Sequence, residues 1–311
     1  MAYAHQPVMV DEVVRMLALK PGSTLIDGTA GGAGHIRANV PAIGPTGRIL
    51  GIDLDPEAVT AAHQATKNDS RVTIVQGNYK NINQIAHVHK FNKVDGIVFD
   101  LGLSTDQLQD RKRGFSFSGT ASLDMRFDPA SALTAGEIIK THSEKQLTEL
   151  FKNYGEEALA LPIAKAITAY RKAAPIETTE TLNAIIQDIY QARYHGRSRT
   201  NPSTKVFQAL RIATNDELGN VDAVLPEAIA LLKPGGRLVV ISFHSLEDRI
   251  VKNYFKRESR DCICPPKTPV CQCGHKKSIM IISKKPLVPS VREIADNPRA
   301  RSAKMRVAEK I

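Results

Sequence analysis

Residues 25–35 read Leu-Ile-Asp-Gly-Thr-Ala-Gly-Gly-Ala-Gly-His, and this stretch decides how the chain is expected to fold. A short apolar run ends in an acid, Asp27, and four glycines follow within seven residues. Glycine has no Cβ and tolerates positive φ, so such a loop lets the backbone approach a ligand closely. Loops of this kind hold nucleotide-type cofactors at the carboxyl ends of parallel strands.

Strand and helix patterns alternate around this loop. Apolar runs predict strands at 24–27, 48–53, 71–76 and 94–100, with helices from His35 and from Pro56 to about Lys67. This spacing is typical of a parallel sheet covered on both faces by helices. After residue 218 we expect a helix at 221–232, a turn at 233–237 and strands at 238–243, 278–283 and 304–308.

The alternation stops between about Thr105 and Leu218, where no strand is expected. Residues 144–172 and 178–194 have apolar positions three and four apart, which predicts helices. The fold class is therefore α/β, a Rossmann-like sheet with an inserted all-helical domain. We place the cofactor-binding domain at 1–105 and 216–311 and the helical insertion at 106–215.

Composition points to a polyanionic partner. The net charge is +10 and the pI about 9.4, which favours nucleic acid over a merely solubilising excess. The N-terminus lacks a signal-peptide pattern and no apolar run is long enough to span a bilayer, so we expect a cytoplasmic protein. A homodimer is left open.

Two further acids accompany the glycine loop. Asp53 ends the second strand, where an acid can accept hydrogen bonds from ribose hydroxyls, and Asp100 ends the fourth. The loop does not match the Gly-x-Gly-x-x-Gly fingerprint of a nicotinamide dehydrogenase, which is the alternative. An acid beside the loop suits a cofactor with a cationic amino group, which favours S-adenosylmethionine. A loop that only packs helix on strand is the structural alternative.

The chain resembles the Rossmann-like S-adenosylmethionine-dependent methyltransferases and, within them, the bacterial 16S rRNA (cytosine-N4)-methyltransferases. The segments that carry the resemblance span nearly the whole chain. They are 5–12, 27–35, Asp100-Leu-Gly-Leu-Ser104, Arg113-Gly-Phe-Ser-Phe117, Leu123-Asp-Met-Arg126, 207–212, Ile241-Ser-Phe-His-Ser-Leu-Glu-Asp-Arg249 and 297–302. Leu232-Lys-Pro-Gly-Gly-Arg-Leu-Val-Val240 resembles the turn into the fifth strand of the wider class.

The resemblance implies cofactor contacts at seven positions: Ala33, Gly34, His35, Asp53, Tyr79, Asp100 and Gln107. Thr29 and Ala33 stand where the wider class commonly has glycine. Tyr79 is interpreted either as a platform for adenine or as an ordinary half-buried tyrosine.

For the chemistry at the cytosine amine, Asp100 is the first candidate acceptor, with a purely cofactor-binding role as its alternative. His244 is the second candidate, as a proton relay or a structural histidine. Asp124 and Arg126 are interpreted as contacts to RNA or as an internal salt bridge.

Basic residues in the insertion suggest a clamp for RNA phosphates. Arg193, His195, Arg197, Arg199, Lys205 and Arg211 fall within a short window. We expect Arg197 and Arg199 to bind RNA, with a solvated basic loop as the alternative. Phe115 and Phe117, which follow Arg111 to Arg113, are candidates for stacking on an extruded base.

Four cysteines, Cys262, Cys264, Cys271 and Cys273, form two Cys-x-Cys pairs close to His275. They could hold a structural zinc ion, with free thiols as the alternative. A reducing compartment argues against disulfides.

The resemblance implies methyl transfer from S-adenosyl-L-methionine to N4 of a specific cytosine in the decoding region of 16S rRNA, with free RNA or the small ribosomal subunit as partner. A non-catalytic RNA-binding or assembly protein is the alternative, although such a protein would be expected to lose at least one of the acids.

Overall fold

The computed structural model describes residues 7–110, 112–117, 119–195, 201–266, 268 and 270–311. The chain divides into two compact units. The sheet unit comprises Met1–Gly102 and Leu218–Ile311, and the helical unit comprises Leu103–Glu217.

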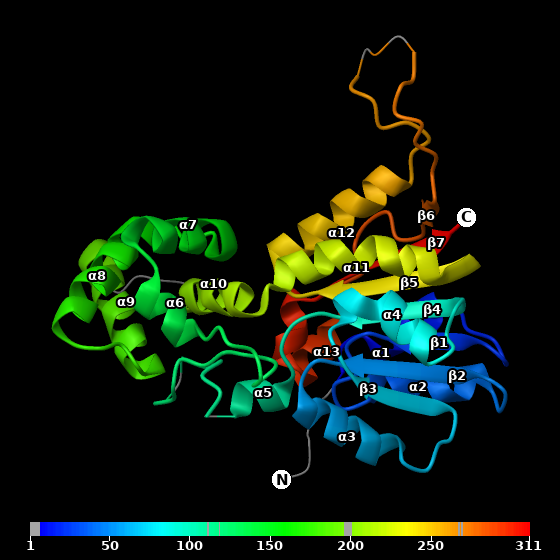
Figure 1. Ribbon diagram of the computed structural model, residues 1–311, viewed down its shortest axis with the longest axis horizontal. Coiled ribbons are helices and arrows are strands. Elements are labelled where there is room, and N and C mark those ends of the chain that lie inside the picture. Colours follow the sequence, from blue (N-terminus) through cyan, green and yellow to red (C-terminus); the bar gives the residue numbers. More distant parts are fainter. Residues whose placement is uncertain (1–6, 111, 118, 196–200, 267, 269) are drawn as a thin grey trace. The chain divides into compact units, whose positions relative to one another are not determined.

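A seven-stranded sheet of order β3-β2-β1-β4-β5-β7-β6 forms the centre of the sheet unit (Figure 1). The five strands from β1 to β5 pair in parallel, whereas β7 is antiparallel to both β5 and β6. The α/β fold is thus confirmed, with an antiparallel pair added at one edge. The strands are β1 (Thr24–Asp27), β2 (Arg48–Asp53), β3 (Val72–Gln76), β4 (Val94–Asp100), β5 (Leu232–Ser242), β6 (Ile279–Ile281) and β7 (Lys304–Lys310).

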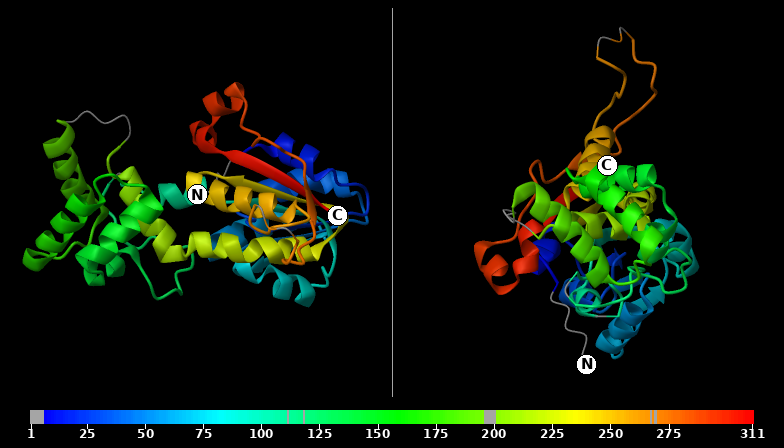
Figure 2. Two further views of the ribbon diagram at one scale, coloured as in Figure 1. Left: turned by 90° about the horizontal axis from the view of Figure 1, so that it is seen from above. Right: turned by 90° about the vertical axis from the view of Figure 1, so that its left-hand side faces the viewer.

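Helices cover both faces of this sheet because successive strand residues, whose side chains point to opposite faces, are both apolar. Ile26 packs in the cluster with α4, α11 and α12, while Leu25 packs in the cluster with α1, α2 and α3. Figure 2 shows α11 and α12 side by side along their face. The helices are α1 (Val10–Leu17), α2 (Gly34–Ile43), α3 (Pro56–Thr66), α4 (Ile82–Val88), α11 (Glu217–Leu231), α12 (Ser245–Glu258) and α13 (Val291–Asp296), with 3-10 turns η1 (Tyr79–Asn81) and η2 (Pro298–Ser302).

The start of β5 corrects the expected turn at 233–237. The strand already begins at Leu232, which pairs with Val94, and Arg237 pairs with Gly96. The register therefore shifts between these pairs, and the extra residues bulge out of the ladder. Gly235 has φ 78°, which a glycine adopts without steric cost. The turn-like sequence therefore forms a bulge within the strand and does not end it.

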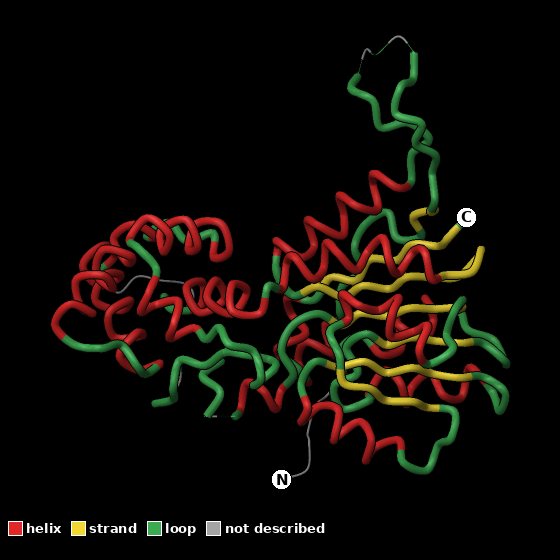
Figure 3. The backbone as a smooth tube through the Cα atoms, in the orientation of Figure 1, coloured by secondary structure: helices red, strands yellow, loops and turns green. Residues whose placement is uncertain are grey.

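The helical unit contains helices and loops and, among its described residues, no strand (Figure 3). Its core is one cluster of apolar side chains, including Phe151, Ile163 and Leu210. Local caps define several helix starts: Ser143 and Gln146 form a reciprocal capping box at the start of α7. The helices are α5 (Thr105–Gln109), α6 (Ala135–Thr141), α7 (Glu144–Gly155), α8 (Ala160–Ala173), α9 (Thr179–Tyr194) and α10 (Thr204–Asn215).

None of the helices in the described part of the chain is both long enough and apolar enough to cross a bilayer.

Candidate cofactor site

Three acids lie at one edge of the sheet. Asp27, Asp53 and Asp100 are the last residues of β1, β2 and β4, and β1 lies between the other two strands. Because the strands are parallel, their carboxyl ends meet at the same edge, which is where open α/β sheets bind ligands.

Backbone hydrogen bonds join the glycine loop after β1 to both neighbouring strands, β4 and β2. The Gly28 N–H donates to the Val98 carbonyl (3.0 Å) and the Ala30 N–H donates to that of Ile52 (2.9 Å). The Gly31 N–H donates to Asp53 Oδ2 (2.8 Å), which ties the loop directly to the acid of β2. The loop is therefore rigidly placed beside the acids before any ligand arrives.

Close packing explains two of the loop's glycines. A Cβ on Gly28 would lie 2.2 Å from the buried Phe99 ring, and one on Gly34 would lie 2.5 Å from Pro7. Ala33 adopts φ 62°, a left-handed conformation unfavourable for a residue with a Cβ, and it starts α2 without a side-chain cap. Strained backbone of this kind is concentrated at ligand sites, and an uncapped helix start presents N–H groups to an anion.

Asp100 and His35 form a buried pair. His35 Nε2 lies 3.3 Å from Asp100 Oδ2, and the two side chains are only 4% and 9% exposed. The Asp100 N–H donates to Thr29 Oγ1 (2.7 Å), which fixes this acid against the loop. Asp100 Oδ1 and His35 Nδ1 are buried without a hydrogen-bond partner in the described structure, which is unusual for buried polar atoms.

Burial shifts the protonation of the acids. Desolvation raises the pKa of Asp27 from 3.8 to about 6, against the opposing effects of His35 and of the Thr29 N–H. Desolvation likewise raises the pKa of Asp53 to about 6, although it accepts hydrogen bonds from Asp55 and Gly31. Burial alone would lower the pKa of His35, but its hydrogen bond to Asp100 and the acidic charges around it raise it. The site is thus an acidic cluster in which His35 bonds to Asp100 and offsets the charge of Asp27.

Tyr79 opens η1, directly after β3. Its ring is half-buried and lies 5.5 Å from the Phe99 ring, centre to centre. It packs against the core cluster of the sheet unit, which is the ordinary structural role expected of a half-buried tyrosine.

Two of the predicted site residues, His244 and Gln107, form helix-capping hydrogen bonds. His244 is the N-cap of α12: its Nδ1 accepts from the Glu247 N–H (3.4 Å), and Glu247 Oε2 accepts from the His244 N–H (3.3 Å). Gln107 forms the equivalent capping box with Ser104 at the start of α5, in the helical unit. Both capping boxes follow a pattern that is visible in the sequence, namely a capping residue and, three positions later, a Glu or Gln.

Asp124 and Arg126 form the internal salt bridge, with two contacts of 2.7 and 2.9 Å. The Arg126 guanidinium also donates to the carbonyls of Pro129 (2.7 Å) and Ser131 (2.6 Å), so it holds its own loop together. The structure therefore gives the arginine a local structural role.

The basic window and its neighbouring aromatics are also partly structural. Lys205 donates to the Glu156 carbonyl (2.8 Å), and Arg211 makes a bidentate pair with Glu217 (2.8 and 2.9 Å). Phe115 is buried and stacks on Phe127, which corrects its expected role as a platform for an extruded base. Phe117 packs edge-on against Phe207. Arg111, Arg197 and Arg199 lie outside the described residues.

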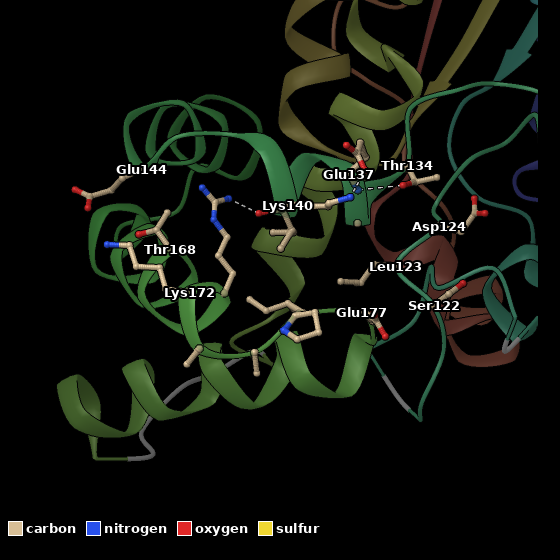
Figure 4. A pocket seen from close by; sticks show the side chains of 17 residues that line it. Ser122, Leu123, Asp124, Thr134, Glu137, Lys140, Glu144, Thr168, Lys172 and Glu177 are labelled. Atoms are coloured by element: carbon tan, nitrogen blue, oxygen red, sulfur yellow. Dashed lines mark hydrogen bonds and ion pairs between the residues drawn. The ribbon is translucent and has the colours of Figure 1, made fainter.

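A cavity of about 1080 Å³ lies within the helical unit (Figure 4), and no sequence pattern predicted it. Its wall carries both acids, such as Asp124 and Glu144, and bases, such as Lys140 and Lys172. Arg171 donates to the carbonyls of Ile139 and His142 and thereby caps the end of α6. Because the wall of the cavity carries both acidic and basic side chains, it differs from a groove that binds phosphates.

The residues at the sheet edge fit S-adenosylmethionine. The acids suit its ammonium, its sulfonium and its ribose hydroxyls, the uncapped start of α2 suits its carboxylate, and the glycines leave room for close approach. The fold and the site together define a Rossmann-like, S-adenosylmethionine-dependent methyltransferase.

The chain belongs to the MraW methylase family, whose model matches residues 2–311. It is 49% identical over 308 residues to "Ribosomal RNA small subunit methyltransferase H" of Thermomicrobium roseum, covering 99% of this chain and 94% of that protein. The protein of the same name from Heliobacterium modesticaldum is 44% identical, with both chains fully covered. Among solved structures, an rRNA methylase from Streptococcus thermophilus aligns with a TM-score of 0.43 and 8% identity, over 97% of this chain and 93% of that one.

Proposed function

We propose that this methyltransferase transfers a methyl group from S-adenosyl-L-methionine to N4 of a cytosine in the decoding region of 16S rRNA, in the cytoplasm. The names of its relatives and the net charge of +10 support an RNA substrate of the small ribosomal subunit. The chemistry is inferred from the two oxygens of Asp100: one pairs with His35, and the other is buried without a hydrogen-bond partner in the described structure.

The sheet edge would hold the cofactor through groups of three kinds. Asp53 would accept from the ribose hydroxyls, Asp27 would face the ammonium, and the backbone N–H groups of Ala33, Gly34 and His35 would meet the carboxylate. When bound there, the cofactor supplies an electrophilic methyl group. A contact of Tyr79 or Gln107 with the cofactor stays a prediction from the resemblance.

Asp100 is proposed as the acceptor for the cytosine amine. The N4 lone pair is delocalised into the ring, so the amine is a weak nucleophile and must be held in line with the methyl group. A hydrogen bond from the amine to Asp100 Oδ1 would orient it and stabilise the positive charge that develops on nitrogen. His35 is a positioning residue, because its bond to Oδ2 fixes how Oδ1 points. The amine proton then leaves toward this carboxylate.

The test uses small ribosomal subunits, and separately free 16S rRNA, from a strain that lacks this protein. Each is incubated with the full chain and methyl-labelled cofactor, and the labelled nucleosides are identified. We expect label in N4-methylcytidine. Label in another base would overturn the assignment, and the absence of any transfer to either RNA would favour a non-catalytic binding protein.

Asp100→Ala should bring turnover to background while the protein stays folded. Asp95→Asn is the matched control, because Asp95 lies on the same strand at its opposite end, bonded to Thr24 and Lys233. Near-normal turnover of Asp100→Ala would remove this acid from the mechanism. His35→Ala separates the positioning role, since it should lower kcat more than it weakens cofactor binding.

A further inference from the structure

The loop between α12 and β6 projects from the sheet unit (Figure 1, orange) and carries all four cysteines of the chain. Its described residues from 261 to 278 form no helix or strand. These described residues also form no apolar core of their own, since Ile263 is 43% exposed and Val270 is 71% exposed. Something other than hydrophobic burial must therefore hold this loop in shape.

The four sulfur atoms converge in this loop. They all lie within 4.8 Å of one another, and the neighbouring separations are 3.8 Å (Cys262–Cys273), 3.6 Å (Cys273–Cys271) and 4.0 Å (Cys271–Cys264). A tetrahedral zinc ion with Zn–S distances of about 2.3 Å requires sulfur atoms about 3.8 Å apart. A disulfide requires about 2.05 Å, so these sulfurs are spaced for a shared cation and not for bonds to each other.

The backbone of the loop is arranged around the same sulfurs. The middle residue of each Cys-x-Cys pair donates to the other pair: Ile263 N–H to Cys273 Sγ (3.4 Å) and Gln272 N–H to Cys264 Sγ (3.3 Å). The Cys264 N–H donates to Cys262 Sγ (3.4 Å). Hydrogen bonds to ligating atoms orient them and tune the metal.

His275 is not part of the cluster. Its Nε2 lies 3.2 Å from the Arg257 carbonyl, at the end of α12. The Ser278 N–H donates to the Glu258 carbonyl nearby (2.9 Å). These contacts close the base of the loop, while the cysteines close its outer part.

We propose that Cys262, Cys264, Cys271 and Cys273 bind one zinc ion as a closed, four-thiolate structural site. Binding of Zn²⁺ by four thiols forms four Zn–S bonds and releases up to four protons, with no change of oxidation state. All four positions are filled by the protein, so no position is left open for a reactant.

The position of the loop agrees with a structural role. α12 begins after the carboxyl end of β5 and spans 14 residues, or about 20 Å, before the loop starts. β6 continues from the loop and pairs with the end of β7, which lies against the start of β5. The cysteines therefore leave from the edge of the sheet opposite to Asp27, Asp53 and Asp100.

The first measurement is the metal content of the full chain, purified without chelators from cells grown with zinc. We expect one zinc per chain, released by a mercurial reagent that titrates the thiols. Replacement by Co²⁺ should give visible bands typical of tetrahedral geometry and a near-ultraviolet thiolate-to-cobalt band.

The variants identify the ligands. The double variant Cys264→Ser with Cys271→Ser, which removes one ligand from each pair, should lose the zinc. Gln272→Ala, between two of the ligands, and His275→Ala should each keep it. Loop proteolysis is the second readout: the double variant and the chelated wild type should be cleaved faster within 261–278, while both still bind S-adenosylhomocysteine.

Four results would overturn the proposal. Metal-free protein with four reactive thiols would mean free cysteines, and a mass lower by two or four hydrogens would mean disulfides. Iron in place of zinc would overturn the identity of the cation, and loss of zinc from His275→Ala would overturn the four-thiolate ligand set.

Discussion

Replacing Asp27 by asparagine should stabilise the protein in the absence of cofactor. The side chain is 1% exposed, and its Oδ1 accepts from the N–H (3.1 Å) and the hydroxyl (3.4 Å) of Thr29. Asparagine keeps an oxygen in the Oδ1 position and removes the buried negative charge. The carboxylate is thus expected to be retained for ligand binding at the expense of stability.

The magnitude follows from the raised pKa. The difference between 3.8 unfolded and about 6 folded corresponds to roughly 3 kcal/mol of destabilisation at pH 7 and above. Between pH 3.8 and about pH 6 the folded chain binds more protons at Asp27 than the unfolded chain does. The free energy of unfolding therefore falls as the pH rises through this range. Asp27→Asn should therefore gain up to about 3 kcal/mol at pH 8, or up to roughly 10 °C in Tm, and almost nothing near pH 4. The gain is an upper bound because His35 loses a nearby negative charge.

The assay is thermal and urea unfolding of the cofactor-free protein between pH 4 and pH 8, with calorimetric titration of S-adenosylhomocysteine alongside. The control is Asp95→Asn. Burial alone would raise the pKa of Asp95, but its bonds to Lys233 and Thr24 lower it, so this variant should lose stability at neutral pH. Asp27→Asn should bind the ligand more weakly. A lower Tm for Asp27→Asn at pH 8, or a gain that does not change with pH, would refute the reasoning.

Three further results are expected. Asp53→Asn should weaken S-adenosylhomocysteine binding by roughly 10- to 100-fold in calorimetry, because an acceptor for ribose hydroxyls is lost. In the wild type, affinity should fall as the pH drops below about 6, where the carboxylate of Asp53 becomes protonated; a flat profile would argue against it. Tyr190→Phe should destabilise the helical unit by about 1–3 kcal/mol in urea unfolding, since the hydroxyl donates to the buried Glu157 carboxylate (2.8 Å).

Local patterns were enough to locate the parallel strands. The runs 24–27, 48–53 and 94–100 have the bounds of β1, β2 and β4, because strands buried on both faces are continuously apolar and each ends at an acid. The bulged start of β5 could not be found this way, since the pairing of Leu232 with Val94 depends on a partner more than a hundred residues away. The antiparallel insertion of β7 between β5 and β6 depends on tertiary packing for the same reason.

The same division applies to the site. The glycine loop and its acids are contiguous signals at strand ends, so the sequence located them. The pairing of His35 with Asp100 spans 65 residues and is visible only once β1 and β4 lie side by side. Phe115 was misjudged because a basic neighbourhood suggests RNA stacking, whereas its burial against Phe127 is a property of the folded helical unit.

The charge of the site also separates two cofactor chemistries that the fold alone does not. A dinucleotide would bring a pyrophosphate to an edge where burial already raises the pKa of Asp27 and Asp53, and its negative charge would raise them further. A sulfonium and an ammonium have the opposite effect, because nearby positive charge stabilises the carboxylates and offsets their desolvation. His35 supplies part of that compensation in the free protein through its contact with Asp100. A bound cationic cofactor therefore stabilises the charged form of these acids, whereas a pyrophosphate would destabilise it.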